Sequence, residues 1–418
     1  MNIKEKAINV VQLQYSTESG GSAALRLQKA FVNGGINSVI ISLIEDDIAA
    51  IENIKYLGKR SALKSKIDIR LQAYLTRKQI KSFGLFSYPL LGTNVAVMEQ
   101  IQNADYIYIH WVLNGFLNLK NIEQLAKLNK PIIIFMHDMW PITGGCHYSF
   151  SCKKYETSCN SCQMFEKAPQ TDLSEKGFTK KLKLYSKYNN LYFVAPSKWL
   201  YNCATQSMLT KNKLVYHIPN VIDSVIFKPF DKKNSKRSFN ISEEEIVIAF
   251  GAVSIDSPYK GWVYLQKALE ILQKDNLFKN VTILIFGSGY NKQIADAIPF
   301  KTKFLGYLRD EYSTALVYNA ADVFIAPSLV EAFGYVIMEA LYCGTPVVGF
   351  EVGGIPDMIK HKENGYIAKY KDAEDVCNGI KFCLQNNLKG YMHAEFNEEV
   401  TIKKHITLFD KIKSFNGG

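Results

Sequence analysis

Two glutamates, Glu331 and Glu339, stand eight positions apart around the pair Phe333-Gly334. A carboxylate accepts hydrogen bonds from two neighbouring hydroxyl groups, and a glycine lets backbone N–H groups approach a phosphate at the start of a helix. This combination suits a ligand that carries both hydroxyl groups and phosphate. The alternative is that both glutamates are solvated surface charges.

The flanking residues predict where the two carboxylates lie. Residues 323–326 form an apolar run typical of a buried parallel strand, residues 335–342 fit a helix, and residues 346–350 fit the next strand. Glu331 is then in the loop between strand and helix, and Glu339 lies on the helix about two turns later. This loop is at the carboxyl edge of an α/β sheet, where such sheets bind ligands.

The whole run around these glutamates, from the Pro-Ser before them to the Val-Gly-Gly-Ile-Pro-Asp after them, resembles the Glu-x7-Glu signature of glycosyltransferase family 4. Members of that family are retaining, use nucleotide sugars and have the GT-B fold. The first glutamate lies near the transferred sugar, and the second accepts hydrogen bonds from the ribose. The resemblance, which extends over nearly the whole chain, therefore implies a catalytic role for Glu331 and donor binding by Phe333, Gly334 and Glu339.

Length and pattern predict two domains. The chain has 418 residues, 47% of them apolar, which is enough to build two cores. Strand and helix patterns alternate up to about residue 222 and again from residue 246, as expected for two doubly wound, Rossmann-like α/β domains facing across a cleft. We predict domains at residues 1–222 and 223–397, with the charged segment 228–245 as the linker. The resemblance implies that a last helix, at about 398–418, packs back on the first domain.

The first domain carries candidate residues after two of its predicted strands. His137 follows an apolar run, and in family 4 a histidine after this strand faces the donor sugar. The adjacent Asp138 then orients His137 or contacts the acceptor. Gly20 and Gly21 follow the first strand and can bring the backbone close to the diphosphate. The alternatives are a structural hydrogen-bonding histidine and an ordinary tight turn.

Three residues of the second domain match donor-binding positions of the family. Lys260 matches a lysine that binds the donor diphosphate, and Tyr307 and Leu308 lie in a loop that resembles the one covering the nucleotide base. An arginine that the family commonly has near Ala252 is missing, so charge neutralisation falls to Lys260, helix N-termini or a basic residue from elsewhere. Tyr307 also fits ordinary packing at the end of a strand.

The sequence nominates no carboxylate nucleophile, which a double displacement would need about 5 Å from the acid. The family's proposed alternative is front-face transfer, in which the departing diphosphate helps to deprotonate the attacking hydroxyl. No Asp-x-Asp pair stands at a suitable strand end to hold a diphosphate-bound metal ion. We therefore expect no catalytic metal.

Four cysteines in the segment 144–162 have the spacing of a metal-binding loop: Cys146, Cys152, Cys159 and Cys162. The final Cys-Asn-Ser-Cys turn is typical of a zinc knuckle. The segment before and around the first cysteine resembles a bacterial exopolysaccharide subgroup that includes colanic-acid-type glycosyltransferases. We predict a structural zinc ion held by the four cysteines, with His147 as a substitute for one of them. Free thiols and disulfides are the alternatives.

The formal net charge of +11 is concentrated in one segment, because nine basic residues and a single acid, Asp68, fall between Lys55 and Lys81. Apolar residues are interleaved there at helical spacing: Ile67, Leu71, Tyr74 and Leu75. One interpretation is a basic amphipathic helix that lies on an anionic membrane, and the other is a solvated helix. No nucleic-acid-binding motif accompanies the charge.

These observations together predict a cytoplasmic enzyme, because neither a signal peptide nor a transmembrane run is visible. We expect it to associate with the inner face of the plasma membrane and to move a sugar from a nucleotide-diphosphate sugar to a lipid-linked glycan, as in the synthesis of exopolysaccharide, capsule or lipopolysaccharide. A soluble α-glucan synthase and a noncatalytic nucleotide-sugar-binding protein are the alternatives. Glucan synthases usually have Lys-x-Gly-Gly in the first loop, where this chain has Glu-Ser-Gly-Gly.

Overall fold

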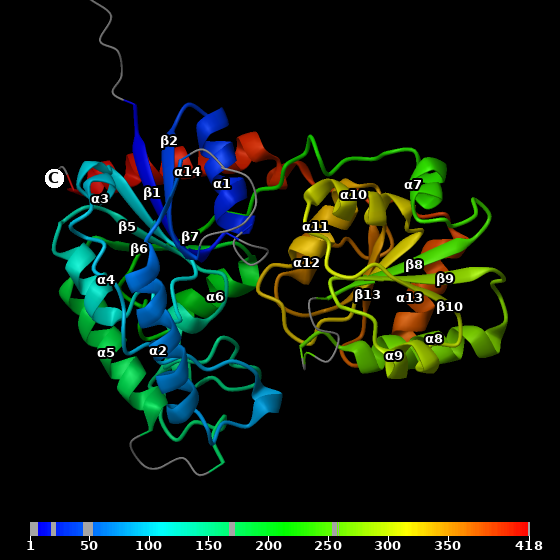
Figure 1. Cartoon of the computed structure of the whole chain (residues 1–418), viewed down its shortest axis with the longest axis horizontal. Coiled ribbons are helices and arrows are strands. Elements are labelled where there is room, and N and C mark those ends of the chain that lie inside the picture. The colour runs from blue at the N-terminus through cyan, green and yellow to red at the C-terminus, as the bar shows by residue number, and fades with distance from the viewer. Residues whose placement is uncertain are drawn as a thin grey trace, which may run out of the picture. The chain divides into compact units, whose positions relative to one another are not determined.

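The computed structural model of the protein describes residues 7–17, 22–44, 53–166, 172–252, 257 and 259–416. These residues form two compact units. The first contains the described residues up to Val221 together with those from Glu398 onward, and the second runs from Ile222 to Asn397. The predicted boundaries differ from this division by one residue. Each unit is a parallel β-sheet with helices packed around it, so the predicted α/β class is confirmed (Figure 1).

The first unit has a seven-stranded sheet in the order β3-β2-β1-β4-β5-β6-β7. Its strands are β1 Asn9–Ser16, β2 Asn37–Ile44, β3 Ile54–Tyr56, β4 Tyr106–Ile109, β5 Ile132–Phe135, β6 Leu191–Ala195 and β7 Val215–His217. Its α-helices are α1 Ser22–Asn33, α2 Lys59–Leu75, α3 Glu99–Asn103, α4 Leu119–Ala126, α5 Leu173–Lys187, α6 Lys198–Gln206 and α14 Glu398–Asn416. The central strands are buried along their whole length, which explains why they read as continuous apolar runs.

Helix α14 comes from the end of the chain and completes the core of the first unit. The ring of Phe409 stacks on that of Tyr106 with centroids 4.1 Å apart, and Tyr106 Oη donates a hydrogen bond to the Phe409 carbonyl at 3.1 Å. His405 Nδ1 and Tyr108 Oη are joined by a hydrogen bond of 2.8 Å. Strand β4 therefore packs against residues about 300 positions later in the chain.

The second unit has a six-stranded sheet in the order β10-β9-β8-β11-β12-β13. Its strands are β8 Ile246–Gly251, β9 Val281–Phe286, β10 Lys301–Phe304, β11 Val323–Ala326, β12 Val347–Phe350 and β13 Gly365–Ala368. Its α-helices are α7 Lys232–Ser238, α8 Trp262–Asp275, α9 Lys292–Ala297, α10 Glu311–Ala320, α11 Tyr335–Tyr342, α12 Ile355–Met358 and α13 Ala373–Gln385. Strand β11 and helix α11 have the bounds that the sequence predicts.

The charged segment 228–245 is not a linker, so that prediction was wrong. It contains helix α7 and belongs to the second unit. The side chain of Lys236 on this helix is 5% exposed. Ion pairs hold this helix in place. Its sequence therefore has no apolar stripe from which its packing could be predicted.

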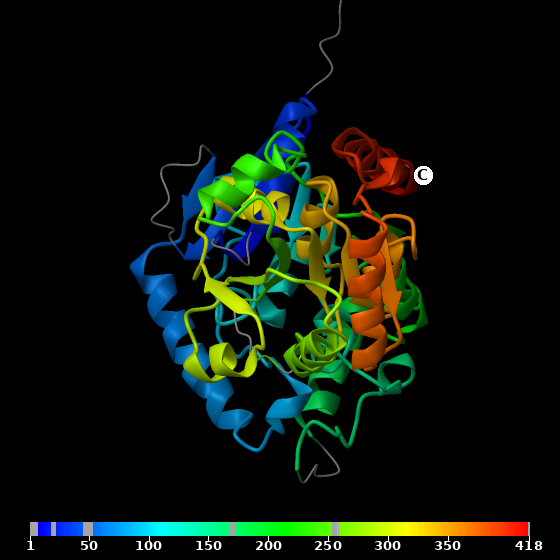
Figure 2. The same ribbon diagram turned by 90° about the vertical axis from the view of Figure 1, so that its right-hand side faces the viewer.

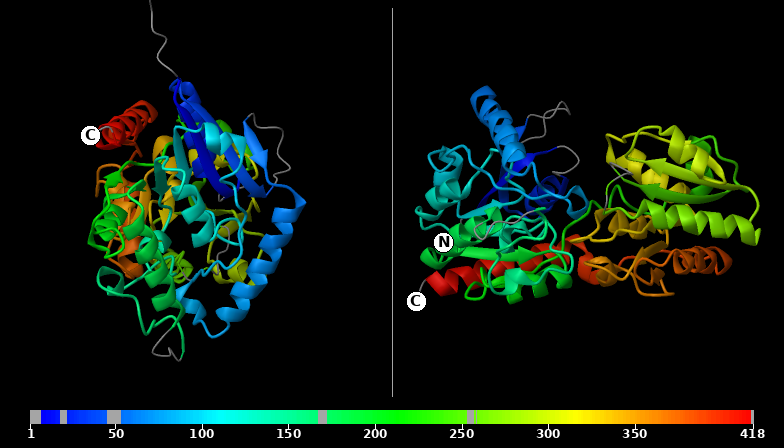
Figure 3. Two further views of the ribbon diagram at one scale, coloured as in Figure 1. Left: turned by 90° about the vertical axis from the view of Figure 1, so that its left-hand side faces the viewer. Right: turned by 90° about the horizontal axis from the view of Figure 1, so that it is seen from below.

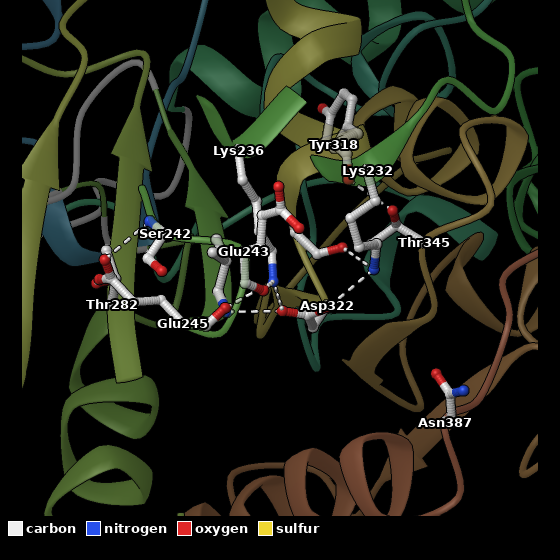
Figure 4. A network of polar contacts seen from close by, with 12 residues as sticks. Lys232, Lys236, Ser242, Glu243, Glu245, Thr282, Tyr318, Asp322, Thr345 and Asn387 are labelled. Carbon is white, nitrogen blue, oxygen red and sulfur yellow. Dashed lines mark hydrogen bonds and ion pairs between the residues drawn. The ribbon is translucent and has the colours of Figure 1, made fainter. Parts of the chain in front are cut away.

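Asp322 is the centre of the polar network that holds α7 (Figure 4). Lys232 Nζ and Lys236 Nζ contact its two carboxylate oxygens at 2.9 and 3.0 Å, and the Val247 N–H donates to it at 2.9 Å. Burial opposes ionisation of Asp322, but the attraction of Lys232 and these hydrogen bonds outweigh it and hold the pKa of the carboxyl below its usual range. The ionised Asp322 therefore joins α7 to strand β8 and to the start of β11.

Helix α2 packs on the first unit through polar residues and exposes apolar ones. Its buried residues are Ser61, Ser65, Asp68 and Gln72, and its most exposed apolar residues are Leu63, Ile67, Ile69, Leu71 and Tyr74. The carboxylate of Asp68 accepts hydrogen bonds from the backbone N–H groups of Leu90 and Leu91, at 2.8 and 2.7 Å. Figures 2 and 3 show α2 at the outer edge of its unit. Hydrogen bonds therefore attach the helix, and its apolar side faces outward.

Among the residues that the structure describes, no helix combines the length and the apolar character needed to cross a membrane.

Candidate functional site

The strongest candidate site lies in the second unit, at the point where the strand order reverses. Strands β8 and β11 are neighbours in the sheet but are far apart in the sequence, and doubly wound sheets bind ligands beside the loops that follow such a pair of strands. Lys260 is in the loop after β8, and Glu331 is in the loop after β11. Lys260 Nζ donates to Glu331 Oε2 at 3.0 Å, and Ser328 Oγ donates to the same oxygen at 3.4 Å. The two charged side chains are 32% and 15% exposed, so a ligand can reach both.

Two glycines allow these loops to come close to each other. A Cβ atom on Gly261, which has a φ of +65°, would lie 1.8 Å from the carbonyl oxygen of Pro327. A Cβ atom on Gly353, which has a φ of +57°, would lie 1.8 Å from the carbonyl oxygen of Glu331. A side chain at either position would displace the backbone that carries the charged pair.

Helix α11 begins directly after the Glu331 loop and has no side-chain cap. Its N-cap residue is Gly334, with a φ of +101°. No side chain caps the start of this helix, where the Ile337 N–H donates to the Gly334 carbonyl at 3.0 Å, and a helix start of this kind can bind a phosphate. Together with Lys260, it provides the positive charge that a diphosphate requires.

Glu339 lies on α11, the helix on which the sequence predicts it, and its side chain is nearly buried. It is 7% exposed, and Tyr318 Oη donates to its Oε2 at 2.8 Å. The Glu339 carboxylate, which is predicted to accept hydrogen bonds from the ribose, therefore already accepts one from the protein itself. The ribose role of Glu339 stays a prediction.

The other predicted donor residues of the second unit differ in exposure. Tyr307 is 48% exposed in the loop after β10, and the carbonyl of the preceding Gly306 accepts a hydrogen bond from the Gly287 N–H at 2.7 Å. Leu308 is half-buried against the core, and Phe333 is 4% exposed within it. Tyr307 is thus the side chain of this group that is most accessible to a nucleotide base.

In the first unit, polar residues of the adjacent strands β1, β4 and β5 form a hydrogen-bonded row. His110 follows β4 and His137 follows β5, and His110 Nδ1 lies 2.9 Å from His137 Nε2. His110 Nε2 lies 2.8 Å from Gln12 Oε1, and Gln12 Nε2 donates to Ser38 Oγ at 3.0 Å. His110 and Gln12 are not among the site residues that the sequence predicted. His110 carries the signal that marked His137, since it is a histidine directly after an apolar strand.

The row fixes the tautomer of His137. Burial lowers the pKa of His137 to about 4, with Asp138 acting in the opposite direction, and burial also lowers the pKa of His110 well below its ordinary value. Both rings are therefore neutral at pH 7. Because Gln12 Oε1 only accepts, His110 Nε2 carries its ring proton, and His137 Nε2 must donate to His110 Nδ1. The remaining nitrogen, His137 Nδ1, is an acceptor that suits a sugar hydroxyl.

Both carboxylate oxygens of Asp138 already have protein partners. The Trp140 N–H donates to Oδ1 at 2.7 Å, and His147 Nδ1 contacts Oδ2 at 2.6 Å. The other ring nitrogen of His147 lies 2.8 Å from Ser87 Oγ. Asp138, which is 8% exposed, therefore anchors the segment after β5, and its predicted contact with the acceptor stays a prediction. His147 has no ring nitrogen left for the zinc role that the sequence suggested.

Two glycines and four cysteines complete the predicted site residues. Gly20 and Gly21 lie outside the described residues. The four cysteines are free thiols that lie near one another: Cys146, Cys152, Cys159 and Cys162. Burial raises the pKa of Cys146 to about 12, and the neighbouring thiols add to this rise. Within the described part of the chain, no group of three or more His, Cys, Asp or Glu residues is arranged to hold a metal ion. The zinc role of the four cysteines stays a prediction.

Metal analysis tests the zinc prediction directly. If the four cysteines close around zinc, the purified protein carries about one zinc ion per chain, because structural sites of this type are tetrahedral and retain their metal. Cys159→Ser then lowers zinc content and melting temperature together. Cys203→Ser, which changes a buried cysteine outside the loop, leaves the zinc content unchanged. A folded, metal-free protein with four titratable thiols in this loop would refute the prediction.

Most of the second unit is similar to a family of known proteins. Residues 231–401 match the model described as "Glycosyl transferases group 1". An uncharacterized glycosyltransferase of Methanocaldococcus jannaschii is 29% identical over 216 residues, which cover 48% of this chain and 54% of the relative. The chain thus spans about half the length of that relative. The N-acetyl-alpha-D-glucosaminyl L-malate synthase of Bacillus anthracis is 21% identical over 353 residues, 80% of this chain and 83% of the relative.

The fold is also that of a solved structure. The crystal structure of Anabaena HepE in complex with UDP and glucose matches with a TM-score of 0.61, covering 98% of this chain and 99% of that chain at 17% identity. This likeness shows the GT-B fold, as the sequence predicted. Residues 231–401 therefore resemble a glycosyltransferase group 1 domain, and the matches support transferase activity.

Proposed function

We propose that this protein is a retaining glycosyltransferase of family 4 that moves a sugar from a nucleotide-diphosphate sugar to a lipid-linked glycan in surface-polysaccharide synthesis. The observation that carries the proposal is the pairing of Lys260 with Glu331 beside the uncapped start of α11. This arrangement offers a cation and backbone donors for a diphosphate, and a carboxylate for the sugar attached to it. HepE, which shares the fold, was crystallised with UDP and glucose, and this supports a uridine donor.

The chemistry that these residues can supply is charge stabilisation and positioning. Lys260 and the first N–H groups of α11 stabilise the negative charge that grows on the departing diphosphate. Glu331 contacts Lys260 and can orient it. Its carboxylate can also accept hydrogen bonds from hydroxyl groups of the sugar. His137 belongs to the first unit, and its accepting Nδ1 would bind a hydroxyl group of the sugar. Because no residue is nominated as a nucleophile, we propose front-face transfer with retention and without a catalytic metal.

A donor screen tests the function. The protein is mixed with UDP, GDP, ADP and their sugars, and melting temperatures are compared, since a ligand at a hundred times its dissociation constant stabilises the fold by about 2.7 kcal/mol. Product from the best donor is then analysed by NMR for the configuration at its anomeric carbon, with and without EDTA. Inverted product, or transfer that is lost in EDTA and restored by magnesium or manganese, would contradict the mechanism. No transfer and no donor hydrolysis would favour the noncatalytic binding protein.

Glu339→Ala weakens nucleotide binding by roughly tenfold to a hundredfold, because a hydrogen bond to a charged group contributes about 1.5 to 3 kcal/mol. The measurement is titration calorimetry with the best nucleotide. Tyr318→Phe is the matched control, since it removes the hydrogen bond inside the protein but keeps the carboxylate. Unchanged affinity in Glu339→Ala, or an equal loss in Tyr318→Phe, would remove Glu339 from the ribose site.

We also propose that α2 docks the enzyme on the inner face of the plasma membrane. Its exposed side combines Leu63, Ile67, Leu71 and Tyr74 with basic residues among and beside them: Lys59, Arg60, Lys64, Lys66 and Arg70. An apolar stripe flanked by cations is the pattern of an interfacial helix on anionic lipid.

The wild-type protein binds anionic vesicles at low salt and releases them at high salt, because each basic residue near the surface contributes up to about 1 kcal/mol that salt screens. Neutralising Arg60, Lys64, Arg70 and Lys78 together lowers binding by up to several hundredfold. The control neutralises four exposed lysines of the second unit: Lys267, Lys274, Lys279 and Lys292. Cosedimentation with vesicles measures both. If the wild type ignores anionic vesicles at low salt, the acceptor is a soluble glycan.

A further inference from the structure

We infer that a groove on the first unit binds a phosphate or diphosphate group carried on an apolar chain. The inference rests on the proposed function, because it names the chemical class of the acceptor. The groove has a volume of about 600 Å³ and lies between the segment 87–90 and helices α4 and α5. We call it the lysine groove.

The charge of the lysine groove is strongly one-sided. It is lined by one acid, Glu123, and five lysines: Lys120, Lys180, Lys181, Lys183 and Lys187. Three of these lysines are engaged, since Lys187 pairs with Glu123 at 2.9 Å, Lys181 donates to the Thr143 carbonyl at 3.0 Å, and Lys180 donates to Tyr88 Oη at 2.9 Å. Within the described residues, Lys120 and Lys183 have no ion-pair partner, and both are exposed. They can therefore close on a multivalent anion.

Between the lysines, the lining of the groove is apolar. It is formed mainly by Tyr88, Pro89, Leu90, Leu119, Trp140 and Leu184. Leu90 is 37% exposed although its backbone is held in place. A small hydrophilic anion would leave this surface in contact with water, whereas an anion with a hydrocarbon chain would cover it. The combination of lysines and apolar side chains in the lining therefore favours an amphiphile over a free phosphate.

One wall of the groove is fixed by helix α2. Gln72 Oε1 accepts from the Tyr88 N–H at 2.8 Å, and Asp68 Oδ1 accepts from the N–H groups of Leu90 and Leu91. The buried polar side of α2 thus holds the segment that lines the groove, while its other side presents the apolar stripe.

Calorimetry with three probes tests the inference on the full chain without any sugar donor. The probes are farnesyl diphosphate below its aggregation concentration, inorganic pyrophosphate and farnesol. We expect farnesyl diphosphate to bind at least about tenfold more tightly than either of the others, because only it uses both the lysines and the apolar side chains. Equal binding of pyrophosphate would mean a site for the anion alone and would overturn the inference.

Matched variants locate the binding. The double variant Lys120→Glu with Lys183→Glu reverses the charge of one lysine on each of α4 and α5. It should weaken the binding of farnesyl diphosphate by about tenfold or more. Lys127→Glu with Lys176→Glu makes the same charge change beside the same two helices, outside the groove, and should change affinity less than about twofold. Leu90→Asp should remove the preference for farnesyl diphosphate over pyrophosphate. Equal losses in the two double variants, with unchanged melting temperatures, would overturn the inference.

The outcome is separable from that of the proposed function. A groove that fails to bind farnesyl diphosphate in a protein that still transfers sugar overturns this inference alone. The opposite result is also informative. If the wild type binds farnesyl diphosphate, the groove variant does not, and the wild type transfers sugar to no acceptor, the inference is supported and the proposed function is overturned.

Discussion

Replacing Glu331 by alanine slows sugar transfer by about a hundredfold to a thousandfold, the range seen when one group that stabilises developing charge is removed. Glu331 accepts hydrogen bonds from Lys260 and Ser328 at the reversal point of the sheet, so its loss removes a contact to the sugar and also releases Lys260. The fold should survive, because both side chains are partly exposed. Initial rates with the best donor, together with melting temperatures, measure the effect.

A double-mutant cycle with Lys260→Ala sharpens this test. Because Lys260 and Glu331 touch, the double variant should lose less activity than the product of the two single losses. Lys292→Ala, which breaks the exposed pair of Lys292 with Asp296, is the control and leaves the rate unchanged. A Glu331→Ala enzyme with wild-type turnover would show that the pair is structural.

Asp322→Ala lowers the free energy of unfolding by about 2 to 4 kcal/mol, somewhat less than for a fully buried ion pair, since the side chain is 23% exposed. The variant leaves Lys232 and the nearly buried Lys236 without their carboxylate, and the Val247 N–H without its acceptor. Denaturant unfolding measures the loss. Asp296→Ala, at an exposed pair, leaves stability nearly unchanged.

The effect of Asp322 also depends on pH in a defined direction. Its pKa is lower in the folded than in the unfolded protein, so its contribution is complete above the unfolded pKa of about 3.9 and is lost as pH falls through the folded pKa. The stability gap between wild type and Asp322→Ala should therefore be constant near pH 7 and should shrink below about pH 4. A gap that stays constant down to pH 2 would mean that the carboxylate charge contributes nothing.

The sequence predicted the buried parts of the fold and missed the parts that depend on distant partners. Strands such as β9 and β11 are continuous apolar runs, so their bounds follow from composition alone. Strands β3 and β7 have three residues each and are partly exposed, which leaves no run to detect. Helix α7 consists of polar residues, and the carboxylate that holds its buried Lys236, that of Asp322, is 86 positions further along the chain.

The candidate site divides in the same way. Lys260 and Glu331 were predictable because each follows an apolar strand and carries a family motif. The row from His137 to Gln12 was not, because it requires the knowledge that β1, β4 and β5 are neighbours. The stripe of α2 was visible in the sequence, but its orientation was not. The choice of the buried side depends on Asp68 and Gln72 finding backbone N–H groups near residue 90.

The return of α14 to the first unit has a consequence for the order of events on the ribosome. Tyr106 and Tyr108 are synthesised early, but the side chains that cover them, His405 and Phe409, belong to the last part of the chain. At a translation speed of about 5 to 20 residues per second, the interval between Val221 and Glu398 takes roughly 10 to 35 seconds. During that interval the second unit can fold from its own residues, while the first waits with an uncovered aromatic face. The unit that begins first therefore finishes last, and a nascent chain stalled before Glu398 would be a natural client for a chaperone.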